Sequence, residues 1–173
     1  MKSDYQQSST LVGFGDPQSA LAWYPVGDAV MGGQSDGALT QPETGHAHFF
    51  GTVRLDNGGG FASVKADLPE PMDVSDRAGI ELLAWGDGRT YKVGLRNSVD
   101  RRSIVYQQAF TPDSLEWSLV RLEFSDFIPT WRGKTLPDAD PLNLRELASL
   151  SLFVSGRQAG AFHLRMQNWT LAS

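Results

Sequence analysis

The 173-residue chain contains no cysteine. Disulfide bonds, a thiolate nucleophile and every zinc site built on cysteine are therefore excluded together. A chain without cysteine fits a reducing compartment. The first ten residues are polar and contain no apolar run long enough for a secretory signal or a membrane span. We therefore expect a cytoplasmic protein with no transit peptide and no membrane insertion.

Basic clusters are also scarce. The chain has 15 Lys and Arg against 20 Asp and Glu, a formal net charge of −5, and its longest basic cluster is Arg101-Arg102. A nucleic-acid partner needs clustered Lys and Arg to neutralise phosphates. We therefore expect no binding to nucleic acid.

Signatures of catalysis and metal binding are few. Neither His-Glu-x-x-His nor Gly-x-Gly-x-x-Gly occurs, and no nucleophile has a recognisable base. His46 and His48 are two residues apart and can share a sheet face, but two ligands do not make a catalytic metal site. No Asp-rich loop has the spacing of a calcium site. We expect no catalytic residues, no metal, no cofactor and no enzymatic activity.

Alternation of apolar and polar residues is the main pattern that is present. Successive side chains of a strand point to opposite faces, so such runs predict strands with one buried face. Residues 80–85 are almost entirely apolar, which predicts a central strand covered on both faces. Alternating runs occupy residues 11–14, 49–55, 62–66, 91–95, 120–124, 150–154 and 162–166, and residues 103–110 are a further candidate.

These short, regularly spaced runs predict an all-β fold, an antiparallel sandwich or barrel of about nine or ten strands. Helical signals are limited to residues 142–147, which suit a helical turn or two. The composition does not change along the chain. We therefore expect a polar tail at residues 1–9 and a single domain at residues 10–173.

The densest motif lies between Trp23 and Gly37. Its paired glycines permit backbone angles that other residues avoid, and its short polar side chains can hydrogen-bond nearby backbone. A structured loop that closes a sheet is the favoured interpretation, and a ligand site is the other. It is not a phosphate loop, because neither Lys-Ser/Thr nor a helical pattern follows the glycines. The residues of the candidate site are Asp28, Met31, Gly32, Gly33 and Ser35.

Two further loops carry turn signals. Asn57-Gly58 and Asp87-Gly88 each favour a hairpin. Arg89 follows the second turn, and Arg96 lies beyond it. Both can present a guanidinium to a carboxylate or to the backbone of a partner, although such residues are more often solvated or paired with a local acid.

A long segment at residues 126–147 contains three prolines. Long loops without secondary structure are usually functional or disordered. Trp131 and Arg132 are adjacent in it, and both residue types are enriched at binding hot spots. Two interpretations stay open, a contact pair for a partner or a tryptophan that plugs one end of the sandwich.

The order of several of these motifs resembles one known family, that of the NADH:ubiquinone oxidoreductase complex I intermediate-associated proteins. The resemblance spans about residues 11–172. It rests on Trp23, residues 28–35, 50–51, 59–64 and 86–91, Trp117, and residues 127–129 and 132–133.

This resemblance implies a galactose-binding-like jelly-roll β-sandwich. Members in mitochondria act as chaperones in the assembly of respiratory complex I, and related domains are linked to photosynthetic complexes. The resemblance thus implies a non-enzymatic assembly factor whose partners are protein subunits of a larger complex. The candidate binding residues are those of the 28–35 motif together with Arg89, Tyr91, Arg96, Trp131 and Arg132.

A carbohydrate-binding module is the alternative. Sugar sites stack rings on aromatic side chains and hydrogen-bond the hydroxyl groups. The residues that suit this role, if they line one sheet face, are Trp85, Tyr91, Tyr106 and Gln108.

Overall fold

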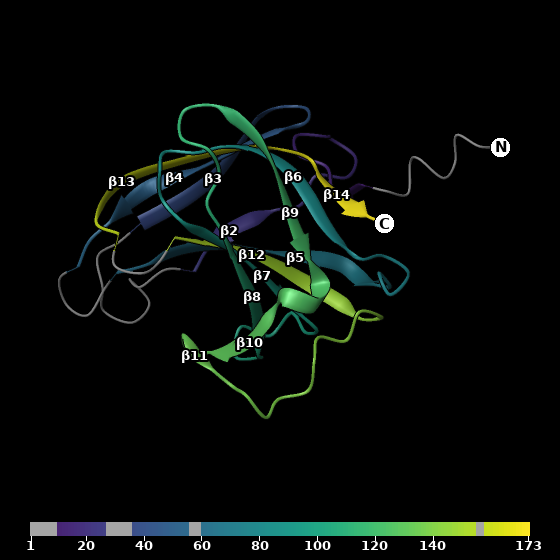
Figure 1. Ribbon diagram of the computed structural model, residues 1–173. Coiled ribbons are helices and arrows are strands. Elements are labelled where there is room, and N and C mark those ends of the chain that lie inside the picture. Colours follow the sequence, from purple (N-terminus) through teal and green to yellow (C-terminus); the bar gives the residue numbers. More distant parts are fainter. Residues whose placement is uncertain (1–9, 27–35, 56–59, 155–157) are drawn as a thin grey trace.

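The computed structural model describes residues 10–26, 36–55, 60–154 and 158–173. These residues form a sandwich of two seven-stranded sheets, with sheet A above sheet B in Figure 1. The predicted all-β class is confirmed. Within the described residues the helical content is one short 3-10 helix, η3 (Phe124–Asp126).

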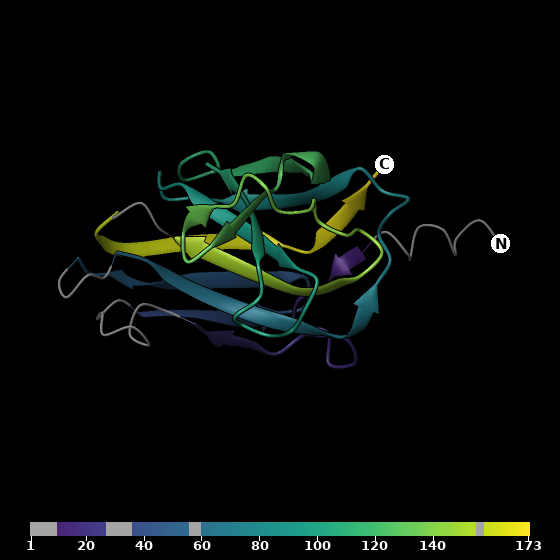
Figure 2. The ribbon, with the colours of Figure 1, turned by 90° about the horizontal axis from the view of Figure 1, so that it is seen from below.

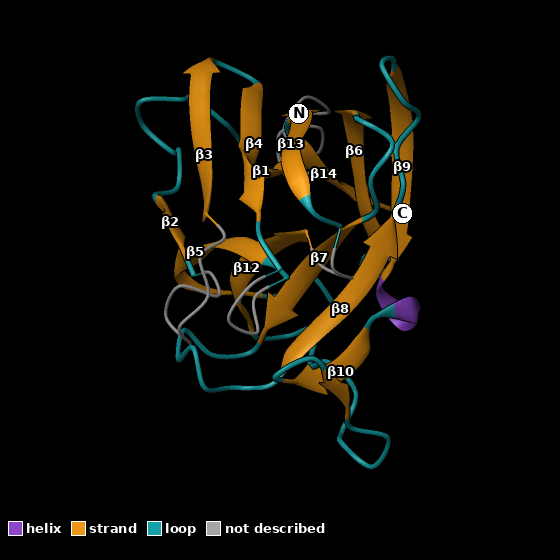
Figure 3. Ribbon diagram, turned by 90° about the vertical axis from the view of Figure 1, so that its left-hand side faces the viewer, coloured by secondary structure: helices purple, strands orange, loops and turns teal. Residues whose placement is uncertain are grey.

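Sheet A is built around β6, which pairs with β9 along one side and with β14 and then β13 along the other. Figure 3 shows its strands side by side, from β3 at one edge to β9 at the opposite edge. The strands of sheet A are β1 (Thr10–Val12), β3 (Asp36–Glu43), β4 (His46–Val53), β6 (Gly79–Trp85), β9 (Trp117–Glu123), β13 (Gly160–Gln167) and β14 (Trp169–Ala172).

Sheet B is also antiparallel, and the chain passes between the two sheets repeatedly, in a jelly-roll arrangement. Figure 2 shows the two ends of the described chain side by side, where β1 pairs with β14 in sheet A. In spatial order the strands of sheet B are β11 (Lys134–Thr135), β10 (Ile128–Trp131), β8 (Val105–Phe110), β7 (Tyr91–Arg96), β12 (Leu147–Val154), β5 (Ala62–Met72) and β2 (Trp23–Pro25).

The predicted hairpins are wrong. The strands before and after Asn57-Gly58 are β4 in sheet A and β5 in sheet B, and Asp87-Gly88 likewise joins β6 in sheet A to β7 in sheet B. Both dipeptides therefore lie in crossovers between sheets. A turn dipeptide specifies a local change of direction, but it does not determine whether the next strand pairs with the previous one.

The segment at residues 126–147 also has more structure than we predicted, because it contains the β10–β11 hairpin. The helical turn expected at 142–147 is an ordinary turn, in which the Glu146 N–H bonds the Asn143 carbonyl at 3.2 Å. Leu147 already begins β12.

The core lies between the inward faces of the two sheets. Phe49 and Phe162 of sheet A pack against Tyr91 of sheet B, with ring centroids 6.2 and 6.4 Å from that of Tyr91. On β6 the inward residues Ile80, Leu82 and Ala84 are buried, as the apolar run predicts. The outward residues Glu81, Leu83 and Trp85 stay partly exposed, which corrects the expectation that both faces of β6 are buried.

Candidate binding surface

The outer face of sheet A carries large apolar side chains where β6 and β9 pair. The register places Leu83 opposite Leu119 and Trp85 opposite Trp117. Leu83 is 37% exposed, Trp117 42% and Leu119 64%. The solvent face of an antiparallel sheet is normally polar. We call Leu83, Trp117 and Leu119 the apolar patch, because contiguous exposed apolar surface marks interaction sites.

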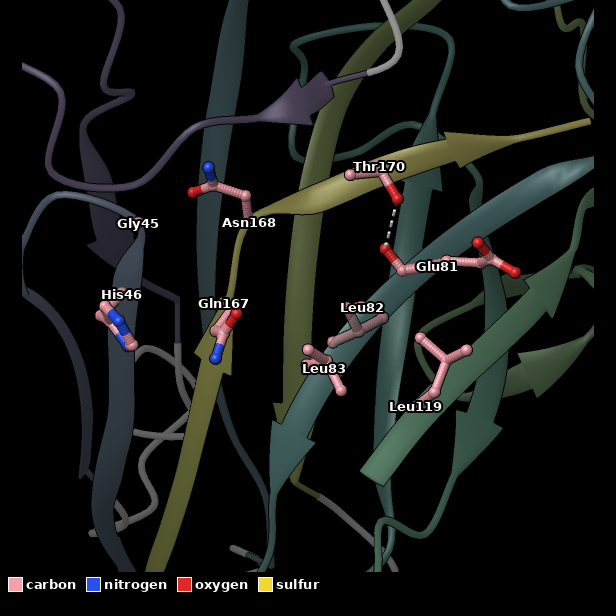
Figure 4. A pocket seen from close by; sticks show the side chains of 9 residues that line it. All are labelled: Gly45, His46, Glu81, Leu82, Leu83, Leu119, Gln167, Asn168 and Thr170. Atoms are coloured by element: carbon pink, nitrogen blue, oxygen red, sulfur yellow. Dashed lines mark hydrogen bonds between the residues drawn. The ribbon is translucent and has the colours of Figure 1, made fainter. Parts of the chain in front are cut away.

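A pocket of about 320 Å³ borders this patch (Figure 4). Leu83 and Leu119 form its apolar side. The opposite side is polar, and there the Thr170 hydroxyl donates to the Glu81 carbonyl at 3.4 Å. The complete lining is Gly45, His46, Glu81, Leu82, Leu83, Leu119, Gln167, Asn168 and Thr170.

Trp85 and Trp117, which lie opposite each other on β6 and β9, differ in what contacts their rings. The Arg165 guanidinium lies over the ring of Trp85, 5.0 Å from its centroid. The rings of Trp117 and His46 are nearly perpendicular, with centroids 6.2 Å apart, and Trp117 stays 42% exposed. Trp117 therefore keeps an open face that can stack on a ligand or a partner.

A histidine pair lies farther along the same face. His48 of β4 and His163 of β13 are stacked, and His48 Nε2 is 3.2 Å from His163 Nδ1. Burial lowers the pKa of His48, and the nearby charges of His163 and Arg165 lower it further. Among the described residues no three His, Asp or Glu side chains gather closely enough to hold a metal ion.

An ion-pair network borders the patch on β9. Arg121 pairs with Glu81 at 3.2 Å and with Glu123, and it also donates to the Ser173 carbonyl at 3.1 Å. The hydrogen bonds to Glu123 and Glu81 raise the pKa of Arg121. This network leaves the patch flanked by groups that are already paired.

The 28–35 motif lies outside the described residues, so Asp28, Met31, Gly32, Gly33 and Ser35 stay predictions. Residues 33–37 also spell Gly-x-Ser-x-Gly, the pattern of a hydrolase nucleophile elbow. That elbow requires a helix directly after the serine. Here residue 36 begins strand β3, so the surrounding structure does not match the elbow.

Tyr91 and Arg89 belong to a structural network. Tyr91 is fully buried, and its hydroxyl donates to Asp87 at 2.9 Å. Burial and the Asp87 carboxylate raise the pKa of Tyr91. Arg89 donates to Asp87 at 3.3 Å and to the Ala159 carbonyl at 2.9 Å. Tyr91 therefore has no surface to offer a ligand, which corrects the prediction that it binds directly.

Arg96 anchors the loop between β7 and β8 by hydrogen bonds to its backbone. It is 7% exposed and donates to the carbonyls of Arg101 and Ser103, at 2.8 and 3.3 Å. Trp131 Nε1 donates to the carbonyl of Arg102 in the same loop at 3.3 Å. Trp131 is 44% exposed and does not plug the sandwich. The Arg132 guanidinium lies over it, 4.6 Å from the ring centroid.

The predicted loops do not converge on one surface. β8 begins at Val105 beside β10 and ends at Phe110 beside the start of β7. Arg89 precedes β7 and therefore lies near Phe110, at the end of β8. Trp131 is the last residue of β10 and lies near Val105, at the start of β8. The Arg89 and Trp131–Arg132 predictions thus fall at opposite ends of sheet B.

The residues of the carbohydrate alternative do not line one face either. Tyr106 is 6% exposed and donates to the Asp140 carbonyl at 2.7 Å. Gln108 donates to the Glu123 carbonyl at 2.8 Å. With Tyr91 in the core, only Trp85 of the four lies on the outer face of sheet A.

The apolar patch was missed at the level of sequence. In the sequence, the apolar run at residues 80–85 indicates this patch, but such a run also predicts a strand that is buried on both faces. Leu119 lies in an alternating strand as an outward residue, where a polar side chain is the norm. An apolar residue at an outward position of each of two strands is the pattern that reveals this site.

Comparison with known proteins identifies the family. The family model of Complex I intermediate-associated protein 30 (CIA30) matches residues 12–166. The chain belongs to this family. A Schizosaccharomyces pombe relative, "Uncharacterized protein C9E9.15", is 29% identical to the present CIA30 chain over 178 residues, which cover 89% of this chain and 80% of the relative.

Solved structures share the fold of this CIA30 chain. The family 11 carbohydrate-binding module of the Clostridium thermocellum cellulase Lic26A-Cel5E superposes with a TM-score of 0.68 at 16% identity, covering 95% of this chain and 93% of the module. The C. thermocellum family 11 module in complex with a β-1,3-1,4-mixed-linked tetrasaccharide gives 0.64 at 17% identity, over 95% and 98%. At these identities the likeness shows the jelly-roll fold alone.

The described part of the chain contains no helix with the length and apolar character to cross a bilayer.

Proposed function

We propose that this CIA30 chain is a non-catalytic binding module that acts in the assembly of a multi-subunit complex, respiratory or photosynthetic. Its partner is a protein subunit, bound at the apolar patch of sheet A. Membership of the CIA30 family supports the kind of partner. The apolar patch supports the place of binding.

One observation carries this proposal. Leu83, Trp117 and Leu119 are exposed side by side on a sheet whose other outward positions are mostly polar or charged. Removing such side chains from water stabilises a complex by about 25 cal/mol for each Å² of apolar surface that is buried. Aromatic anchors such as Trp117 are typical of binding hot spots.

The proposal is tested in cells whose own copy of the protein is replaced by variants. A Trp117→Ser/Leu119→Ser double variant removes most of the exposed surface of the apolar patch. A matched control, Val99→Ser/Ile128→Ser, removes side chains of similar exposure, 53% and 51%, from other parts of the molecule.

The readout is native electrophoresis with quantitative mass spectrometry of the co-migrating subunits. We expect the wild type and the control to migrate with a partly assembled complex, and the double variant to lose that association by about tenfold or more. Equal behaviour of the double variant and the control would show that the patch is not the binding surface.

A saccharide is the second candidate ligand, and the pocket is the observation that favours it. Polar residues such as Gln167 and Asn168 line a pocket of about 320 Å³ together with the apolar side chains of Leu83 and Leu119. Sugars likewise have polar edges and apolar faces.

Calorimetric titration with a β-1,3-1,4-mixed-linked tetrasaccharide, the ligand of the similar C. thermocellum module, tests this candidate. Binding heat that disappears in Leu83→Ser would support it. No heat with the wild type at millimolar sugar would count against the saccharide and leave the protein partner as the ligand class.

A further inference from the structure

We propose that β9 is an acceptor edge, to which an extended segment of the partner adds as a further strand of sheet A. This inference rests on the proposed function and specifies how the partner is bound. Unpaired strand edges are templates for another chain, and natural proteins usually protect them by short length, proline, bulges or charge.

Four of the five edge strands are protected in this way. β1 and β2 have three residues each and β11 has two, and β2 ends in Pro25. β3 is longer, but it contains Pro42 and its register with β4 shifts beyond Thr40. β1, β2 and β11 are too short to offer a row of backbone groups to a partner. β3 keeps a regular register from Asp36 to Thr40, but it also contacts β2 and β5 of the other sheet.

β9 differs from the other four. It pairs with β6 over seven consecutive positions with no shift in register. Its sequence contains no Pro, Gly or Lys. Figure 3 shows β9 as the outermost strand on its side of sheet A, beyond β6. Within the described residues, β9 is therefore the longest edge with an unbroken register, and its two charged residues, Arg121 and Glu123, are paired with each other.

The direction of the backbone groups follows from one hydrogen bond. The Phe124 N–H donates to the Ala78 carbonyl at 2.8 Å, toward β6. Because amides alternate in direction along a strand, Val120 also faces β6. The N–H and C=O groups of Leu119 and Arg121 then point to the open edge.

The open stretch has a defined end. The outward carbonyl of Glu123 already accepts a hydrogen bond from Gln108 Nε2 at 2.8 Å. An added strand therefore lies along Trp117 to Arg121. Its side chains on the outer face would extend the apolar patch, beside Trp117 and Leu119.

Charge favours a particular partner segment. Exposed acids lie before and after the open stretch, and the cation on β9 itself, Arg121, is paired with Glu81 and Glu123. A second copy of this chain would bring the same acids against one another. The occupant is therefore a segment of another protein, apolar at alternate positions and flanked by Lys or Arg. The exposed acids are Asp113, Glu116 and Asp126.

The test uses the full chain and a synthetic peptide of alternating valine and threonine flanked by lysines. Binding is followed by the change in tryptophan fluorescence that is lost in Trp117→Phe, and by amide hydrogen exchange. We expect the amides of Leu119 and Arg121 to exchange fast in the free protein and at least about tenfold more slowly with peptide bound. The amide of Val120 should be protected in both states.

Two variants separate backbone from side-chain binding. Leu119→Ala removes only the side chain, whereas Leu119→Pro also removes the outward N–H, and proline is tolerated at such edge positions. We expect Leu119→Pro to bind the peptide about fivefold or more weakly than Leu119→Ala. A peptide with N-methylated alternate amides, or with Glu in place of Lys, should bind weakly.

Three outcomes would overturn the inference: no binding of the peptide, equal affinities of the Ala and Pro variants when both are folded, or fast exchange of the Leu119 and Arg121 amides in the complex. The exchange measurement uses the wild-type chain and so does not depend on the folding of the proline variant. If the apolar-patch variants still lose the assembling complex, the proposed function stands and only strand addition fails.

Discussion

The hydroxyl of Tyr91 donates a 2.9 Å hydrogen bond to the carboxylate of Asp87 inside the sandwich. The other oxygen of this carboxylate accepts the backbone N–H of His163 at 2.8 Å. Tyr91 belongs to sheet B and His163 to sheet A. Asp87, in the crossover between β6 and β7, therefore fastens the two sheets to each other at one end.

Removing the Tyr91 hydroxyl should weaken this fastening. Because Tyr91→Phe deprives a largely buried carboxylate of one donor, we expect a loss of about 1 to 2 kcal/mol in the free energy of unfolding, measured by urea denaturation. Tyr106→Phe is the control. Its hydroxyl donates to a carbonyl, and its loss should cost about 1 kcal/mol or less. Equal costs would show that Asp87 gives no special stabilisation.

Arg96 should stabilise the β7–β8 loop. Burial lowers the pKa of this guanidinium, yet its hydrogen bonds to backbone carbonyls keep it in place. We expect Arg96→Ala to cost about 2 to 3 kcal/mol and to speed amide exchange in residues 97–103. Arg102→Ala, at a side chain 88% exposed, should change stability by less than about 0.5 kcal/mol. Unchanged loop exchange in Arg96→Ala would contradict this role.

Leu115 should be a site of backbone strain. Its φ of 60° lies in the left-handed region, and its N–H is held by the Gly86 carbonyl at 2.9 Å. This conformation costs about 1 to 2 kcal/mol for most residues, and less for asparagine. Leu115→Asn should therefore raise the thermal midpoint, by about 0.5 to 1 kcal/mol in stability, whereas Leu115→Ala keeps the strain and should not. A lower midpoint for Asn than for Ala would refute the strain.

Stability should fall on mild acidification because of His48. Its folded-state pKa is lowered, so the folded protein binds fewer protons at this site than the unfolded chain. The stabilisation is complete above the unfolded pKa of about 6.5 and is lost as the pH falls through it toward the folded pKa. Urea midpoints between about pH 7.5 and 5.5 test this. His48→Gln should flatten the decline, and an unchanged slope would argue against it.

Much of the fold was predictable, because period-two alternation depends only on which face of a strand is buried. What surrounds a strand depends on partners distant in sequence. The run at residues 80–85 looks like a fully covered strand, but in the described part of the chain its outward residue Leu83 stays 37% exposed, and only a guanidinium lies over Trp85. In the same way, Asp87-Gly88 predicts a turn and cannot say that the next strand belongs to the other sheet.

The candidate site was less predictable for the same reason. Leu83 and Leu119 become neighbours only through the pairing of β6 with β9, and neither residue carries a recognisable motif. The side chains of Arg96 and Tyr91 can bind a partner, but both are buried and form hydrogen bonds within their own chain. Residue type indicates what a side chain can bind, whereas the packing decides whether it binds its own chain or another.

The protection of all edges but β9 also limits the size of any assembly built on this sandwich. A polymer that grows by strand exchange needs a donor end and an acceptor end on each subunit. Within the ranges that the structure describes, β9 is the acceptor edge that we propose, and no second edge of comparable length and regularity is present. Under the proposed strand addition, each domain would therefore accept one partner strand, and growth into fibres would not follow.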